Sequence, residues 1–272
     1  MTAIVVDGAL CTRCGICSAI CPSGIVEPAD EKNLPRVTDA RGRMCIRCGH
    51  CEVSCPSQAL LLDFLPEEKI RLQAGDGAVS VQDLGLYLKK RRSVRHYIQE
   101  PVAKETITQV LDIARYAASG GNRQPLEWLV VHDPDEVRRL AGLTIDWMKT
   151  LRNGSHPMSG FVQPLIAAWE RGGDPVCRGA PHLLIAHVPA GNPHASTDAI
   201  IALTYVDIAA PAFGIGTCWA GFLSMAAEAN IPLQEALALP PGRAFAYAMM
   251  FGYPRYKIYG IPRRNPVKVT FR

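Results

Sequence analysis

Eight of the ten cysteines lie in two short runs near the N-terminus, CTRCGICSAICP and CIRCGHCEVSCP. Each run has the spacing C-x2-C-x2-C-x3-C-P. A [4Fe–4S] cluster needs four thiolates around four irons, and two-residue gaps let three thiolates of a tight loop face one centre. The sequence therefore predicts two [4Fe–4S] clusters, with eight ligands: Cys11, Cys14, Cys17, Cys21, Cys45, Cys48, Cys51 and Cys55.

This spacing is similar to that of bacterial ferredoxins, in which the last cysteine of each run binds the other cluster. The resemblance implies that Cys55 completes the cluster of Cys11, Cys14 and Cys17, and that Cys21 completes the cluster of Cys45, Cys48 and Cys51. It also implies a two-cluster ferredoxin domain over residues 1–65. Structural zinc is the alternative for a C-x2-C pair, and disulfides would require an oxidising compartment. Two complete four-cysteine runs favour the clusters.

The composition fits a globular protein with a full core. Of 272 residues, 48% are hydrophobic and 20% are charged, and no apolar stretch is long enough to span a bilayer. The start, MTAIVVDGAL, lacks a basic leader, so we expect a cytoplasmic protein without a membrane partner. The formal charge is +4, but each oxidised cluster with its ligands adds about −2. The near-neutral total argues against binding to nucleic acid.

The remaining chain predicts a second domain over residues 80–272, after a linker at 66–79 rich in Pro, Gly and charge. Ser80 is a candidate helix N-cap, and a second helix is expected from Lys104 to Ala118. EWLVVHD, HLLIAHV and FAYAMMFGYP are expected strands, and DAIIALTYVDIAAPAFGIG a central apolar helix. Residues 135–172 show an irregular pattern with at least one helix. Alternating helices and strands predict an α+β or α/β fold.

Separated segments of this domain together resemble the nitroreductase family of FMN-dependent oxidoreductases. They are RRSVRHY (residues 91–97), ASGGNRQP (118–125), GIGTCWAGF (214–222), GYP (252–254) and PRR (262–264). The resemblance implies an α+β domain with a central mixed sheet and helices, one bound FMN, and a homodimer whose flavin sites lie at the two-fold interface. Two positions depart from the family pattern: Ala118 precedes Ser119, and Leu126 follows Pro125.

The resemblance also assigns roles to individual residues. An FMN phosphate is a dianion, which Arg can bind bidentately. The phosphate and ribityl end is expected at Arg91, Arg92 and Ser93, with Arg263 or Arg264 closing from the C-terminus. Arg95 is expected beside the flavin pyrimidine, where a cation stabilises the anionic reduced ring. A partner's loop would contribute Ser119, Gly120, Gly121 and Asn122. Backbone N–H groups of Trp219, Ala220 and Gly221 are expected to face the reactive edge of the flavin.

These features predict an oxidoreductase that passes electrons from a low-potential donor through the clusters to FMN, and on to a small organic acceptor. The expected acceptors are nitroaromatics, quinones or conjugated carbonyls. The donor is a ferredoxin-like protein or, alternatively, NAD(P)H acting directly at the flavin. Other interpretations are a non-enzymatic electron carrier, and a specialised flavoenzyme of the same fold such as a dehalogenase or a flavin-fragmenting enzyme. Residues 143–178, where the substrate would be recognised, carry no interpretable motif.

Overall fold

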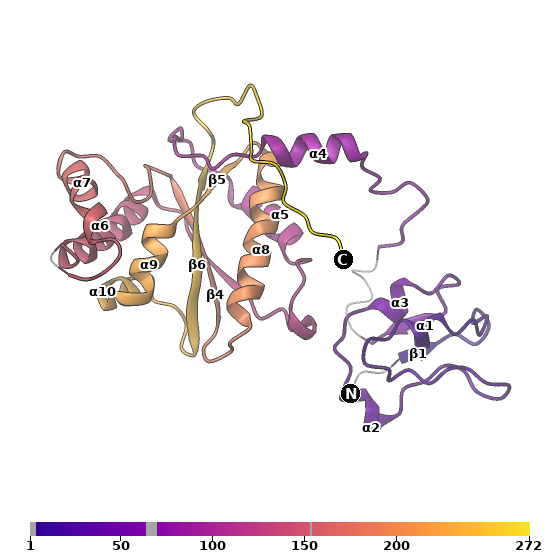
Figure 1. Cartoon of the computed structure of the whole chain (residues 1–272). Coiled ribbons are helices and arrows are strands. Elements are labelled where there is room, and N and C mark those ends of the chain that lie inside the picture. The colour runs from indigo at the N-terminus through magenta and orange to yellow at the C-terminus, as the bar shows by residue number, and fades with distance from the viewer. Residues whose placement is uncertain (1–3, 64–69, 153) are drawn as a thin grey trace. The chain divides into compact units, whose positions relative to one another are not determined.

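The computed structural model describes residues 4–63, 70–152 and 154–272 of the chain. It divides into two compact units (Figure 1). The first contains Met1–Ala78 together with Gly121–Arg123, and the second contains Val79–Gly120 and Gln124–Arg272. The predicted linker, residues 66–79, begins outside the described residues, and the boundary between the units falls at its far end.

The first unit has little regular structure. Strands β1 (Ile4–Val6) and β2 (Leu60–Leu62) form an antiparallel pair. Three helices of four residues each are α1 (Ile16–Ala19), α2 (Asp39–Gly42) and α3 (His50–Val53). The buried apolar side chains among its described residues are Ile25, Val26, Pro35, Ala59, Leu60 and Leu62. So small a core cannot offset the entropy of ordering about 60 residues, and another source of stability is needed.

The two cysteine runs share one backbone conformation. Arg13 and Arg47, which precede the second cysteine of each run, have φ angles of 56° and 54°. Gly15 and Gly49 follow with φ angles of 75° and 78°, directly before helices α1 and α3. The left-handed conformation is disfavoured for Arg by about 1–2 kcal/mol. Local preference therefore does not explain why the same strained turn occurs in both cysteine runs. The internal repeat of the sequence is also a repeat of structure.

The second unit is built on a four-stranded sheet. Its strands, in spatial order, are β3 (Glu127–Val131), β4 (His182–Pro189), β6 (Arg243–Gly252) and β5 (Gly216–Trp219). The expected strands are present, but the expectation of a mixed sheet is not met: every strand pair among the described residues is antiparallel. Val131, the last residue of β3, pairs with Leu183 near the start of β4. The helices between the two strands bring the chain back to the end of the sheet where β3 finishes, so β4 runs antiparallel to β3.

Helices cover both faces of this sheet (Figure 1). Successive residues of β4 alternate between two apolar cores, with Leu183 and Ile185 in one and Leu184 and Ala186 in the other. The first core is closed by α6 (Pro134–Thr150), α7 (Ser159–Glu170), α9 (Gly221–Ala229) and α10 (Ile231–Leu237). The second is closed by α5 (Lys104–Ala114), α8 (Ala195–Ala209) and the 3-10 helix η3 (Ala210–Phe213).

Local signals place several helices correctly. Helix α4 (Val81–Lys90) begins after Ser80, whose hydroxyl accepts the Asp83 N–H at 3.0 Å, as an N-cap should. The central apolar helix is α8, and helix α5 ends four residues before its expected end. The stretch 135–172, expected to be irregular with at least one helix, forms two helices, α6 and α7. A short 3-10 turn, η2, covers Gly120–Asn122. No helix in the described part of the chain is long and apolar enough to cross a membrane.

Candidate functional site

Two cavities in the first unit are lined by cysteines. One is lined by Cys11, Cys14 and Cys17 together with Cys55, and the other by Cys45, Cys48 and Cys51 together with Cys21. Each cavity therefore takes three cysteines from one run and the last cysteine of the other run. This is the exchange that the ferredoxin-like spacing implies.

The cysteines of the second cavity also interact electrostatically. Burial, followed by the neighbouring thiols of Cys48, Cys21 and Cys45, raises the pKa of Cys51 to about 11. Four thiolates can share such a site only if bound cations compensate their charge, as iron does. No three His, Cys, Asp or Glu side chains in the described residues are close enough to hold a single metal ion. Four sulfurs around each cavity match in number the thiolates that one [4Fe–4S] cluster needs.

Apolar side chains complete the second cavity. Ile25, Val26, Val37 and Leu62 line it beside the cysteines, and all but Val37 are buried. An apolar shell limits the access of water to a cluster and so affects its reduction potential. The few core residues of the first unit thus pack around the proposed cluster sites rather than around each other alone.

In the second unit, the RRSVRHY segment lies along the outer edge of β5. The Val94 N–H donates to the Thr217 carbonyl at 2.8 Å, and the Ile98 N–H donates to Tyr253 at 3.0 Å. A Cβ atom on Gly216 would lie 2.8 Å from Val94 Cβ and 2.9 Å from Pro254 Cγ, so only glycine permits this approach. Three of the segments that carry the nitroreductase resemblance therefore meet in one place.

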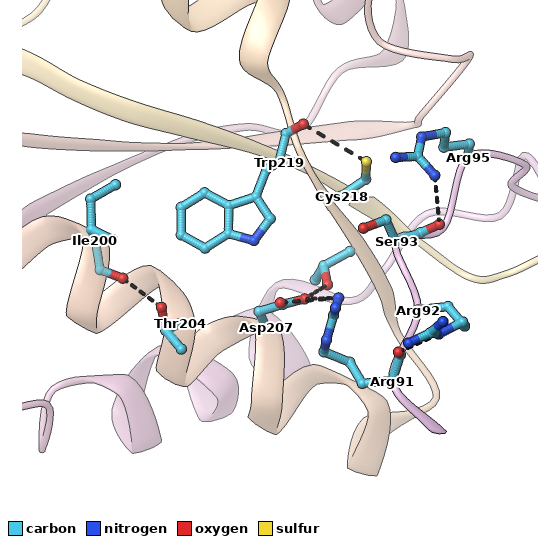
Figure 2. A network of polar contacts seen from close by, with 10 residues as sticks. Arg91, Arg92, Ser93, Arg95, Ile200, Thr204, Asp207, Cys218 and Trp219 are labelled. Carbon is cyan, nitrogen blue, oxygen red and sulfur yellow. Dashed lines mark hydrogen bonds and ion pairs between the residues drawn. The ribbon is translucent and has the colours of Figure 1, made fainter. Parts of the chain in front are cut away.

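Arg91 is held by a buried carboxylate that sequence reasoning did not identify. Its Nη1 lies 3.2 Å from Oδ2 of Asp207, which is 6% exposed on the last turn of α8. Figure 2 shows the two side chains turned toward each other. The Thr217 hydroxyl also donates to Asp207. The ion pair fixes one side of the guanidinium and leaves Nε and Nη2 as a fork that could bind a phosphate.

Ser93 and Arg95 lie beside the buried thiol of Cys218 (Figure 2). Burial raises the pKa of Cys218, although the Arg95 guanidinium and a hydrogen bond with Ser93 act in the opposite direction. Cys218 is consequently a neutral thiol near pH 7 and a poor nucleophile. Arg95 itself is exposed, and its Nη1 donates weakly to the Ser93 carbonyl at 3.4 Å.

The Trp219–Gly221 segment only partly matches the expectation that its N–H groups face a flavin. The Ala220 N–H donates to the Ala248 carbonyl at 3.0 Å, so the sheet uses it and the expectation is wrong for this residue. Alternation in an antiparallel pair turns the Trp219 N–H toward the outer edge of β5, where Thr217 accepts from the RRSVRHY segment. Gly221 begins helix α9, whose first N–H groups have no partner within the helix.

The loop of residues 118–125 is held at other points of the unit. The Gly120 N–H donates to Asp198 Oδ1 on α8 at 3.0 Å, and the Gln124 N–H donates to the Ser119 hydroxyl at 3.0 Å. Gly121 and Asn122 have φ angles of 59° and 52°. Both group with the first unit, within which Asn122 Nδ2 donates to the carbonyls of Ile46 and Arg47.

The other predicted arginines are less fixed. Arg92 is half-buried, and its Nε donates to the Arg91 carbonyl. Arg263 and Arg264 are exposed in the C-terminal segment, residues 255–272, which forms no helix or strand. The structure thus brings Arg91, Arg92, Ser93 and Arg95 beside β5 but does not bring the C-terminal arginines to them.

Asp198, Asp207 and Arg243 are the important residues that sequence reasoning missed. Asp198 and Asp207 could have been identified from the sequence, because charged residues within a helix predicted to be buried require partners. Arg243 left no such signal, because its contacts are with the loop before β3 and with β4.

The comparisons with known proteins agree with these features. The profile of the Nitroreductase family matches residues 88–253, and that of the 4Fe-4S dicluster domain matches residues 10–60. The first match covers more than half of the chain, which therefore belongs to the nitroreductase family of oxidoreductases, with a 4Fe-4S dicluster domain at its N-terminus.

Individual relatives are distant. Iodotyrosine deiodinase 1 of Rattus norvegicus is 37% identical over 75 residues, which are 28% of this chain and only 24% of the rat protein. An NADH dehydrogenase of Thermus thermophilus is 24% identical over 196 residues, 67% of this chain and 95% of that protein. The crystal structure of an FMN-bound nitroreductase from Desulfitobacterium hafniense covers 68% of this chain with a TM-score of 0.55 and 20% identity; the match takes in 96% of that structure. This likeness confirms the α+β fold of the second unit.

Proposed function

We propose that the protein is an FMN-dependent iron–sulfur oxidoreductase that takes electrons from a low-potential donor through two [4Fe–4S] clusters and passes them through FMN to a small organic acceptor. The observation that carries the proposal is the pair of four-cysteine cavities in a chain of the nitroreductase family. Bound FMN would accept electrons singly or in pairs, and so would link one-electron clusters to a two-electron acceptor.

The residues beside β5 fit a flavin phosphate. Among the described residues, Nε and Nη2 of Arg91 have no partner on the side away from Asp207, and Arg92 adds a second, half-buried cation next to it. Since Asp207 neutralises much of the Arg91 charge, we assign the larger share of attraction for the dianion to Arg92, and Arg263 or Arg264 would have to move to close the site from the C-terminal segment. Arg95 would stand beside the flavin pyrimidine, and Ser93 beside the ribityl chain.

A homodimer would complete the site. The loop of residues 118–125 is fastened to the first half of α8 and, through Pro125, to Arg243 at the start of β6. The RRSVRHY segment is instead bound near the C-terminal ends of α8 and β6. A two-fold partner could bring the loop of one subunit to the arginines of the other. Exposed apolar side chains on α8 and in the C-terminal segment offer surface for such a partner: Ile200, Tyr205, Ile208, Tyr259 and Phe271.

The presence of the first unit supports a protein as the physiological donor. A flavoenzyme reduced directly by NAD(P)H would not need clusters, so we favour a ferredoxin-like protein donor over NAD(P)H. Nitroaromatics, quinones and conjugated carbonyls are the proposed acceptors. A non-enzymatic electron carrier is the second candidate, and it predicts no turnover of any small acceptor.

An anaerobic absorbance titration tests the proposal. Iron, sulfide and FMN are first quantified, with eight irons and one FMN expected per chain by the ligand count. NADH, NADPH and reduced ferredoxin are then added in turn. Bleaching of both cofactors by ferredoxin alone supports the proposed route. Rapid reduction of the flavin by NAD(P)H while the clusters stay oxidised would instead identify a nitroreductase with an accessory cluster domain.

Column sizing with light scattering tests the assembly separately. A dimer that retains one FMN per chain is expected. A monomer with tightly bound FMN would contradict the shared site without contradicting the cofactor.

A further inference from the structure

The loop of residues 118–125 has a backbone conformation that its own sequence does not favour. Gln124 has a φ angle of 46°, in the left-handed region that residues with a Cβ atom rarely adopt, whereas Asn122, at 52°, is of a residue type that adopts this region more readily. Strained backbone of this kind persists only where surrounding contacts enforce it, and it concentrates at functional sites. The question is which contacts enforce it here.

Packing beneath the loop is incomplete. A cavity of about 140 Å³ is lined by Ser119, Gln124 and Pro125 of the loop and by Asp198 and Trp128 behind it. Side-chain packing therefore does not press the loop into shape from this side. Hydrogen bonds have to do so, and the Ser119–Gln124 bond within the loop cannot anchor it to the rest of the unit.

Asn122 is held by its bonds to the Ile46 and Arg47 carbonyls within the first unit. The parts of the loop that belong to the second unit are anchored by two side chains from distant parts of the chain. Asp198, 8% exposed on α8, accepts the Gly120 N–H at 3.0 Å. Arg243, at the start of β6, donates from Nη2 to the Pro125 carbonyl at 2.9 Å. One anchor holds each end of the strained stretch.

Arg243 is itself held in place. Its side chain is 12% exposed, and it donates to the His187 carbonyl at 2.8 Å and to His187 Nδ1 at 3.1 Å. A carboxylate oxygen of Glu127 lies 3.4 Å from its Nη1. These partners fix the guanidinium, so it donates its remaining N–H to the Pro125 carbonyl without further loss of side-chain entropy. Lysine lacks the planar fork and could not reproduce this arrangement.

We propose that Asp198 and Arg243 are positioning residues that hold the 118–125 loop in the strained shape in which it meets the flavin. The role of the loop at the flavin rests on the proposed function, whereas the hold on its shape does not. Neither side chain needs to touch the flavin, since both act through the backbone of the loop.

The test uses the full holoprotein and the variants Asp198→Ala and Arg243→Lys. Hydrogen exchange of the Gly120 and Gln124 amides is expected to accelerate at least tenfold, and the Kd for FMN to rise about tenfold. Unchanged exchange at these amides in both variants would overturn the proposal. If wild-type protein binds no FMN, the proposed function fails, but the exchange measurement still decides the role of the two residues.

Matched controls separate positioning from general loss of stability. Asp112→Ala and Arg139→Ala remove exposed charges from ion pairs on α5 and α6, and should leave both readouts at wild-type values. Asp198→Asn keeps an oxygen that can accept the Gly120 N–H, so it should stay near wild type even if Asp198→Ala folds poorly.

Relief of strain provides a second discriminating readout. Glycine adopts a φ of 46° readily, so Gln124→Gly in the Asp198→Ala background should restore part of the FMN affinity. Failure of Gln124→Gly to restore any affinity, in a variant whose thermal midpoint is unchanged, would contradict a role through loop strain.

Discussion

The two units of this protein are stabilised by opposite means. In its described residues, the first has two three-residue strands, three four-residue helices and six buried apolar side chains, but it surrounds two cavities with eight cysteines. The second places separate apolar cores on both faces of a four-stranded sheet. The first unit therefore depends on ligation for its fold, and the second depends on packing.

The same difference governs how each unit forms a site. Ligand positions in the first unit are close in sequence and repeat with a fixed spacing. In the second unit, the important contacts join residues 78 to 118 positions apart, such as Gly120 with Asp198 and Arg243 with Pro125. Perturbations chosen for one unit should therefore leave the other largely intact.

Removal of iron should have the largest effect. An iron chelator under anaerobic reducing conditions is expected to unfold the first unit completely, because its core is too small to fold alone. All four tryptophans, at positions 128, 147, 169 and 219, lie in the second unit. Tryptophan fluorescence and its thermal midpoint should therefore stay constant while far-UV circular dichroism changes. A joint loss of both signals would refute the independence of the units.

Crowding at the edge of β5 should have the next largest effect. Gly216→Ala would place a methyl group 2.8 Å from Val94 Cβ, which we expect to destabilise the second unit by about 3 kcal/mol. Urea unfolding followed by tryptophan fluorescence measures this change. Gly160→Ala on α7 is the control, because its Cβ meets nothing within 4 Å and should stabilise by about 0.5 kcal/mol. Iron content should not change in either variant.

Breaking the Arg91–Asp207 pair should follow. Among the described residues, Arg91→Ala leaves the buried Asp207 carboxylate with only the Thr217 hydroxyl, at an expected cost of about 2 kcal/mol, discounted because Arg91 is 30% exposed. Adding Asp207→Asn to this variant removes the stranded charge and should recover about half of the loss. As a control, Lys149→Ala removes one partner of an exposed ion pair and should lower the free energy of unfolding by less than about 0.5 kcal/mol. A double variant less stable than Arg91→Ala would disprove the pairing.

The smallest effect concerns acid. His182 is fully buried; its Nε2 accepts the Val102 N–H at 2.9 Å, so Nδ1 carries the proton and donates to His132. Burial, followed by the charge of His132, lowers the pKa of His182 below 6.5, and burial and then Arg243 lower that of His187. Below pH 6.5 the unfolded chain binds more protons than the folded chain, so stability falls as pH falls toward the folded pKa values, and is constant above pH 6.5.

The slope of this loss is at most about 1.4 kcal/mol per pH unit for each histidine. Urea unfolding between pH 5 and 8, again followed by tryptophan fluorescence, measures it. His182→Gln should reduce the slope by about half. An unaltered slope would mean that other groups, and not this buried histidine, set the acid sensitivity of the second unit.

The sequence predicted most of the fold because its local signals were strong. Repeated cysteine spacing predicted which cysteines line each cavity, Ser80 predicted the start of α4, and apolar runs predicted strands β3, β4 and β6. At least one helix was expected in residues 135–172, but the bounds of α6 and α7 were not predicted because Gly and Pro interrupt the pattern; Pro164 is accommodated inside α7.

The candidate flavin site was less predictable. The arginine-rich segment could be placed by its resemblance to a family, but not the partners of its side chains. Asp207 lies 116 residues from Arg91, and no periodicity relates them. The Ala220 N–H was assigned to a ligand although the sheet uses it, because strand pairing on β5 cannot be read from four residues.

The exchange of cysteines between the two cavities has a consequence for any fragment of the first unit. A peptide that carries one run alone contains three cysteines of one cavity and one of the other, so it cannot supply all four cysteines of either cavity. Two copies of such a peptide could close both by reciprocal donation. The first unit is in this sense a dimer of half-units joined in a single polypeptide, and cutting the chain between the runs should leave its halves associated as long as iron is bound.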